Sequence, residues 1–131
     1  MNLESPKVSV PKSPQDVFEF LSDVKNFESL MPENISKFEL LEKDKFLFAL
    51  KGMPEIVLEK KETVPPNKII LGAAGGKIDF SLTSHIQETG PESSEVQLAF
   101  SGNINSMMAM MIKGPISKLI ETLATNIPKA V

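Results

Sequence analysis

The middle of the chain consists of short segments bounded by turn sequences, which predicts a series of strands, and residues 77–87 and 95–102 alternate cleanly between apolar and polar side chains, as strands with one apolar face do. Between residues 77 and 87, for example, Phe80 and Leu82 share one face while Ser81 lies on the other. The predicted strands are residues 7–10, 35–41, 45–51, 55–64, 68–73, 77–87 and 95–102. Turn-forming sequences rich in Gly, Pro and Asn separate many of them, at residues 52–54, 65–67, 75–76 and 89–92. Such short links favour an antiparallel meander with one buried face and one wet face.

Two short helices are expected between the first two strands. Ser13 is a good N-cap and Pro14 suits the first helical position, so a helix is expected to begin there. Apolar residues follow at helical spacing, namely Val17, Phe20, Leu21 and Val24. Asn26 is expected to cap a second short helix, residues 27–30, which Pro32 ends.

The last segment, residues 105–129, has the longest helical pattern. Its apolar stripe recurs every three or four residues and comprises Ile104, Met108, Met111, Ile112, Ile116, Leu119, Ile120, Leu123 and Ile127. A helix of this length would span roughly 36 Å, enough to cross a small sheet. Gly114-Pro115 interrupts the pattern, and the missing N–H of proline predicts a kink there or a division into two helices.

The composition is that of one soluble α+β domain, expected to occupy residues 1–131. Hydrophobic residues make up 41% of the chain, too many for a disordered protein. No run of about 18 apolar residues occurs, so no membrane span is predicted. Residues 1–12 lack the apolar core of a signal peptide. The absence of Cys excludes disulfides and thiolate metal sites, and it is compatible with a reducing compartment, so the expected location is the cytoplasm.

The charged residues argue against a nucleic-acid partner. All 14 cationic side chains are lysines, and the formal net charge is -3 at pH 7. Arginine is the usual residue for bidentate recognition of phosphates and guanine edges, and a nucleic-acid binder normally shows a basic face. Because Tyr and Trp are also absent, we expect any ligand cavity to be mainly apolar and to offer few hydrogen bonds.

No combination of side chains typical of catalysis or of a metal site occurs in the sequence. His85, the one histidine, is expected on the solvated face of its strand, without a nucleophile or a second ligand in reach. Lys60 and Glu62 share the inner face of their strand if that strand is regular, and Ser84 is also expected to point inward. We expect these three residues at the rim of the core. The alternative is a place inside a pocket, where they would orient a polar group of a ligand.

Four methionines lie close together near the start of the last helix: Met107, Met108, Met110 and Met111. Methionine is flexible and polarisable, and it fits irregular or adaptable apolar surfaces. Helical geometry places Met108 and Met111 on the side of Ile112. Met110 should point away from it. We expect the group either to pack in the core or to form a pliable cavity wall, and Cu(I) binding is disfavoured because no Cys or His accompanies the thioethers.

The first helical region carries a recognisable pattern: Ser13-Pro14, then Val-Phe-Glu-Phe-Leu-Ser-Asp at residues 17–23, Asn26, and Leu30-Met31-Pro32. With the meander and the long last helix, this pattern resembles the START-like superfamily, also called SRPBCC, which includes birch-pollen-allergen-type proteins and polyketide cyclases. The resemblance implies an α+β helix-grip fold. In that fold, a curved antiparallel sheet with two short N-terminal helices wraps around a long C-terminal helix, and a cavity lies between them.

The resemblance also implies a range of functions. Many such proteins bind lipids, sterols, hormones or polyketides in the cavity, a minority are cyclases or dehydratases, and some bind partner proteins. The superfamily has no universal catalytic motif, so the resemblance assigns no catalytic residue, metal or cofactor to this chain.

We therefore expect the chain to bind or carry a small hydrophobic molecule, lipid-like or polyketide-like, between the sheet and the last helix. The expected cavity wall comprises Phe48, Ile56, Leu58, Phe80, Leu82, Ser84, Phe100, Met108, Met111 and Ile112. One alternative is an enzyme of the cyclase or dehydratase type that uses Lys60 or Glu62 as acid or base. The other alternative is a protein-interaction module whose cavity is closed by its own side chains.

Overall fold

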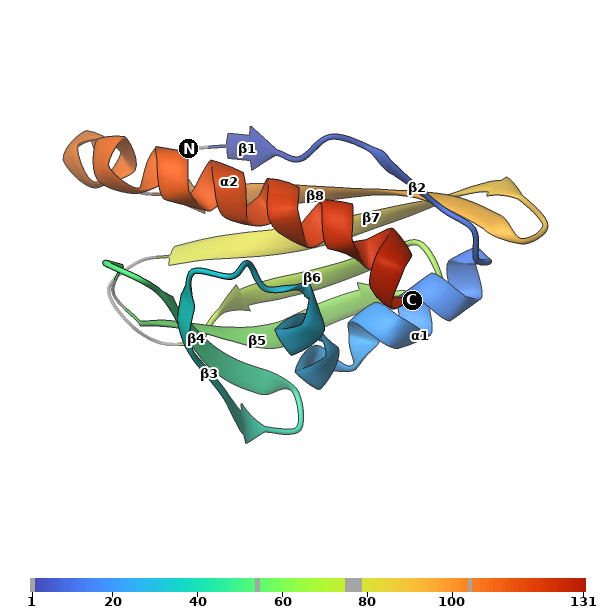
Figure 1. Cartoon of the computed structure of the whole chain (residues 1–131), viewed down its shortest axis with the longest axis horizontal. Helices are drawn as coiled ribbons and strands as arrows, with labels where there is room; N and C mark the ends of the chain where they lie inside the picture. The colour runs from blue at the N-terminus through green and yellow to red at the C-terminus, as the bar shows by residue number, and fades with distance from the viewer. Residues whose placement is uncertain (1, 54, 75–78, 104) are drawn as a thin grey trace.

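The computed structural model describes residues 2–53, 55–74, 79–103 and 105–131. Its strands are β1 (Asn2–Glu4), β2 (Val8–Val10), β3 (Ile35–Glu42), β4 (Lys45–Leu50), β5 (Ile56–Val64), β6 (Lys68–Ala73), β7 (Asp79–Gly90) and β8 (Ser93–Asn103). Its helices are α1 (Pro14–Ser22), the 3₁₀ helix η1 (Val24–Leu30) and α2 (Ser106–Ala130). Figure 1 shows α2 lying across the curved sheet, with α1 near its C-terminal end. The predicted α+β class and helix-grip architecture are confirmed.

The described strands form an eight-stranded sheet in the order β1-β8-β7-β6-β5-β4-β3, and β2 also pairs with β8. The pairs from β3 to β8 are all antiparallel, so the predicted meander is confirmed. Strand β1 is an addition that the alternation does not predict, because its three residues are too few to show a pattern. It forms because β8 offers an open edge, on which Leu3 pairs with Phe100.

Phenyl rings build one end of the core on the inner face of the sheet. Phe46 is fully buried, and its ring centroid lies 5.6, 5.3 and 6.0 Å from those of Phe27, Phe38 and Phe48. Removing a buried phenyl ring typically costs about 3–5 kcal/mol. This stack therefore fixes η1, which carries Phe27, against β3 and β4.

The two short helices begin differently from one another. Ser13 caps α1 as predicted, because its hydroxyl accepts from the backbone N–H of Asp16 at 3.2 Å. Helix η1 begins at Val24, so the prediction that Asn26 caps it is wrong. The Asn26 side-chain amide instead donates to the backbone oxygen of Phe20 at 2.9 Å. Phe20 lies in the last turn of α1, where backbone carbonyl groups lack partners within the helix, and Asn26 supplies a donor to one of them.

The last helix, α2, runs continuously through Pro115. The predicted division at Gly114-Pro115 is therefore wrong. The ring of a proline usually clashes with the Cβ of the preceding residue when that residue is helical, but Gly114 has no Cβ. Asn105 caps the helix by accepting from the backbone N–H of Met108 at 2.8 Å. Its buried residues all lie within residues 116–127, and no helix in the described part of the chain is long and apolar enough to cross a membrane.

The ends of the other elements lie close to the predicted ones. Strand β6 has the predicted bounds, and β7 and β8 continue further than expected towards their common turn, to Gly90 and from Ser93. The turn predicted at residues 75–76 lies outside the described residues, as does Ile104.

Candidate ligand-binding site

An open groove of about 970 Å³ lies between α2, the link from η1 to β3, and the turn from β4 to β5. The two connecting segments contribute Met31, Pro32, Glu33, Asn34, Leu50, Lys51, Gly52 and Met53. Helix α2 contributes Met111, Gly114, Pro115, Lys118, Leu119, Thr122 and Asn126. Figure 1 shows the two connections below α2, in teal and green. The groove is therefore built by three segments that are distant in the sequence.

The α2 wall follows the helical repeat, because residues three or four apart lie on one face of a helix. Met111 and Pro115 make its apolar part, and Lys118, Thr122 and Asn126 continue the same face as a polar row. These polar residues recur every four positions beside the buried apolar stripe of α2. This spacing is visible in the sequence and could have indicated the wall, but the sequence analysis did not name Lys118, Thr122 or Asn126 as site residues.

Backbone hydrogen bonds hold the opposite wall together. The N–H of Lys51 donates to the backbone oxygen of Asn34 at 2.9 Å, which joins the two connecting segments. The N–H of Met53 donates to the backbone oxygen of Leu50, also at 2.9 Å, and closes the turn. Gly52 takes a φ of 83° there, a conformation that glycine adopts without steric cost.

The two walls meet at one end and along the floor of the groove. The side-chain amide of Asn126 donates to the backbone oxygen of Leu30, the last residue of η1, at 2.9 Å. Leu50 and Leu119 line the groove and are only 3% and 5% exposed, so they form its deepest, apolar part. The walls are thus fixed relative to each other before any ligand arrives.

The strand residues expected to line a cavity lie on the inner face of the sheet. The buried ones are Phe48, Leu58, Leu82, Ser84 and Phe100. Ile56 and Phe80 are partly buried against the core, and the ring centroids of Phe80 and Phe100 are 5.4 Å apart. None of these seven residues lines the groove beside α2, so contact between them and a ligand stays a prediction.

The α2 residues of the expected wall divide into two kinds. Met108 and Ile112 are partly buried, whereas Met111 lines the groove and is 72% exposed. Met107 and Met110 are 77% and 84% exposed, so Met110 points away from the core as helical geometry predicts. Packing in the core, one of the two expectations for the methionines, is therefore wrong for Met107, Met110 and Met111. Met111 is accessible both to water and to a molecule in the groove.

Lys60 and Glu62, the candidate acid and base, are not brought together. The Lys60 ammonium donates to the backbone oxygen of Ser22 at 2.9 Å and lies 3.2 Å from the Asp44 carboxylate. The register of β5 against β6 shifts between Lys60 and Glu62, and Glu62 pairs with Ile70. The assumption of a regular strand is therefore wrong, because the extra residue of the bulge turns Glu62 to the outer face.

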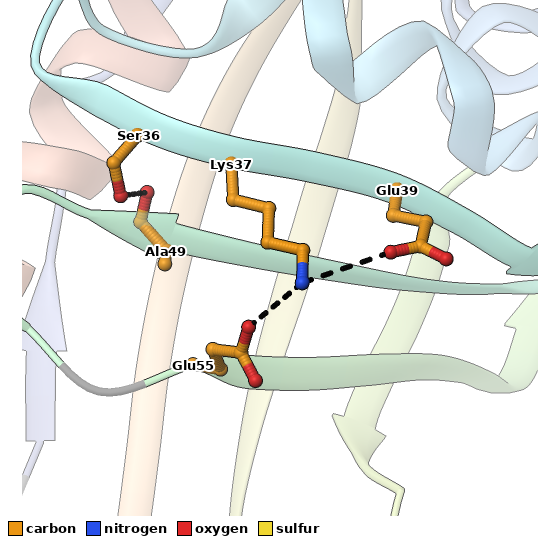
Figure 2. A network of polar contacts seen from close by, with 5 residues as sticks. All are labelled: Ser36, Lys37, Glu39, Ala49 and Glu55. Atoms are coloured by element: carbon orange, nitrogen blue, oxygen red, sulfur yellow. Dashed lines mark hydrogen bonds and ion pairs between the residues drawn. The ribbon is translucent and has the colours of Figure 1, made fainter.

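A polar network joins β3, β4 and the start of β5 (Figure 2). The Lys37 ammonium lies 3.0 Å from the Glu55 carboxylate and 3.9 Å from that of Glu39, and the Ser36 hydroxyl donates to the backbone oxygen of Ala49 at 3.2 Å. The hydrogen bond that Lys37 donates to the Glu55 carboxylate, together with the negative charge of Glu55, raises the pKa of Lys37 above its ordinary 10.5. Because these side chains are exposed, the ion pairs stabilise the sheet only slightly, and we assign them no part in binding.

His85 lies on the solvated face of β7, as the alternation predicts, and is exposed. It pairs with Lys68 of β6 on one side and with Gln97 of β8 on the other. Across the described residues, no group of three or more His, Cys, Asp or Glu side chains is arranged to hold a metal ion.

No protein-family model matches the sequence, and no curated protein sequence matches it. Solved structures do match its fold. A START superfamily protein from Mycobacterium smegmatis is 14% identical, with a TM-score of 0.70 over 99% of both chains. A norcoclaurine synthase point mutant from Thalictrum, in complex with a transition state analogue, is 11% identical, with a TM-score of 0.72 over 98% of this chain and 94% of that one. A conserved protein from Geobacillus kaustophilus is 18% identical, with a TM-score of 0.68 over 98% and 93%. The chain therefore has the START-like helix-grip fold.

Proposed function

We propose that the chain binds a small hydrophobic molecule in the groove beside α2. The groove itself carries the proposal, because its volume of about 970 Å³ falls within the range of small-molecule sites, about 300–1,000 Å³. Its apolar lining comprises Met31, Pro32, Leu50, Met53, Met111, Pro115 and Leu119. A ligand that covers this lining would gain about 25 cal/mol for each Å² of apolar surface removed from water.

Two further observations support a binding role. The norcoclaurine synthase mutant has the same fold and holds a transition state analogue, so this architecture can enclose a small molecule. In this chain, Met31, Met53 and Met111 come from all three segments of the groove. Flexible thioether side chains adapt to ligands of different shape, which suits a binding protein with few fixed polar contacts.

Catalysis by the pair named from the sequence is less well supported. Lys60 is engaged by Ser22 and Asp44, and Glu62 lies on the other face of the sheet. An acid or base must reach the reacting atoms of a bound substrate. Neither side chain lines the groove, so we propose binding ahead of catalysis.

Titration with a neutral, environment-sensitive dye such as Nile red tests the proposal directly. Because the chain has no Trp and no Tyr, protein emission does not interfere with the dye signal. Two threonines on α2 provide a matched pair of variants. Thr122 lines the groove, whereas Thr125 is exposed on α2 and lies outside the lining.

We expect Thr122→Phe to weaken dye binding by about tenfold or more, because the phenyl ring occupies space that the dye needs. Thr125→Phe should leave the affinity unchanged. Circular dichroism of both variants checks that they are folded. Equal affinity in folded Thr122→Phe and wild-type protein would show that the groove is not the site.

A further inference from the structure

The groove carries cations on both of its walls. Lys51 lies at the β4–β5 turn and Lys118 on α2, and both are exposed. Within the described part of the chain, neither lysine takes part in an ion pair. Glu33 is the one acidic residue in the groove lining, against two lysines. The groove therefore has a net positive lining, although the whole chain has a net charge of -3.

The sequence leading up to Lys118 strengthens this imbalance, and the first acidic residue after it, Glu121, is exposed and lies outside the groove lining. From residue 96 to residue 120 the chain has no Asp or Glu, and Lys113 and Lys118 are the only charged residues. Five other lysines do have a carboxylate partner, among them Lys37 and Lys61 at 3.0 and 3.1 Å. A positive potential without a partner raises the local concentration of anions, most of all in a hollow with apolar walls.

Apolar and charged groups are separated along the α2 wall. Lys118 is seven residues from Met111, which corresponds to roughly 10 Å along a helix. Thr122 lies one turn beyond Lys118 on the same face, where its hydroxyl can donate a hydrogen bond. The wall thus offers an apolar stretch followed by a cation and a hydroxyl.

We infer that the natural ligand is an anionic amphiphile, an apolar chain or ring system that carries a carboxylate or a phosphate group. The anionic group lies between Lys51 and Lys118, and the apolar body lies along Met111 and Pro115. The inference rests on the proposed function and names the ligand class for the same groove. Lysine holds an anion as a flexible point charge, so the lining accepts either kind of oxyanion without the planar fork of arginine.

Four twelve-carbon compounds that differ only in the head group test the inference: dodecanoate, dodecyl phosphate, dodecanol and dodecylamine. Each is titrated against the complex of Nile red with the wild-type protein, below its micelle-forming concentration or, for dodecanol, below its solubility limit. We expect the two anions to displace the dye at several-fold lower concentration than dodecanol, and the amine to be the weakest. An exposed charge pair contributes up to about fivefold in affinity, so two lysines can contribute up to about twenty-five-fold. The order of the two anions separates a free carboxylate from a phosphate head group.

Paired variants assign the preference to the two lysines. Lys51→Gln with Lys118→Gln should bring the anions to the level of dodecanol and leave dodecanol unchanged. The control is Lys12→Gln with Lys129→Gln, which changes the net charge equally at exposed positions outside the groove. It should keep the preference. The preference should also shrink at about 1 M salt, where the screening length is about 3 Å.

The possible failures are distinguishable. If wild-type protein binds the dye but dodecanoate and dodecanol displace it equally, the anionic ligand is wrong and the apolar groove stands. If the control pair loses the preference as fully as the groove pair, overall charge explains it and the inference fails. If the wild-type protein binds neither the dye nor any alkyl compound, the proposed function itself is wrong.

Discussion

At the scale of single residues, Lys60 shows how the fold accommodates a charge next to its core. Its side chain is 23% exposed, and its ammonium caps the last carbonyl of α1 by donating to Ser22. The C-terminal end of a helix has carbonyl groups without intrahelical partners and favours a nearby cation. The contacts of Lys60 therefore indicate a role in stability, with Asp44 as its counter-ion.

Replacing Lys60 by Met tests this role. The variant keeps an apolar stem of similar length but removes a charge-assisted hydrogen bond, so the free energy of unfolding should fall by about 1–2 kcal/mol. Urea denaturation followed by circular dichroism measures the change. Dye affinity should stay at the wild-type value.

Lys61→Met is the matched control, because the Lys61 ammonium lies 3.1 Å from Glu59 with a side chain that is 46% exposed. Its loss should change stability by less than about 1 kcal/mol. If a folded Lys60→Met protein no longer bound the dye, Lys60 would have a role in ligand binding and not only in stability.

At the scale of elements, α2 has two unlike halves. Its C-terminal half is buried through residues such as Leu119, Leu123 and Ile127. Its first half carries the exposed Met107, Met110 and Met111. Figure 1 shows these first turns at the far end of the molecule from α1. Packing holds the second half, whereas the first half depends on its cap and on the continuity of the helix.

Pro115→Ala should strengthen that continuity. Pro115 lies inside α2 and has no N–H for the backbone oxygen of Met111, four residues earlier. Alanine supplies the donor and a better helix propensity, partly offset by a more flexible unfolded chain, so the free energy of unfolding should rise by about 1–2 kcal/mol. Urea denaturation measures it.

Ser117→Ala, two residues further along α2, separates the propensity effect from the restored hydrogen bond. We expect it to change stability by less than about 0.7 kcal/mol, the range of propensities among ordinary residues. A Pro115→Ala protein that is less stable than wild type would mean that the restriction of the unfolded chain by proline outweighs the restored hydrogen bond.

At the scale of the whole molecule, the groove opens beside the methionines of α2, so oxidation reports its occupancy. In dilute peroxide, Met107, Met110 and Met111 should be oxidised ahead of the partly buried Met31 and Met53, because exposure controls access to the sulfur. Peptide mass spectrometry measures the order. With saturating dodecanoate, Met111 should be protected, because it lines the groove and Met107 and Met110 do not. Equal protection of Met110 would instead place the ligand on the outer side of the helix.

Local rules were enough for most of the fold. The turn sequences on either side predict β6 with its observed bounds, and Ser13 caps α1 because a hydroxyl three residues before a backbone N–H is a local arrangement. The element order and the pattern from Ser13 to Pro32 resemble the superfamily whose helix-grip fold the structure has. These features depend on neighbours within a few residues, or on a periodicity that a single strand or helix displays by itself.

The candidate site could be found only from the tertiary structure. The bulge that separates Lys60 from Glu62 depends on pairing with β6, and β1 exists only through its contact with β8, almost the whole chain away. Of the residues expected to contact a ligand, Met111 alone lines the groove beside α2. That groove brings Lys51 and Lys118 to facing walls through two connecting segments and a helix. The polar row on α2 recurs every four residues, but that spacing does not reveal which distant segments face it.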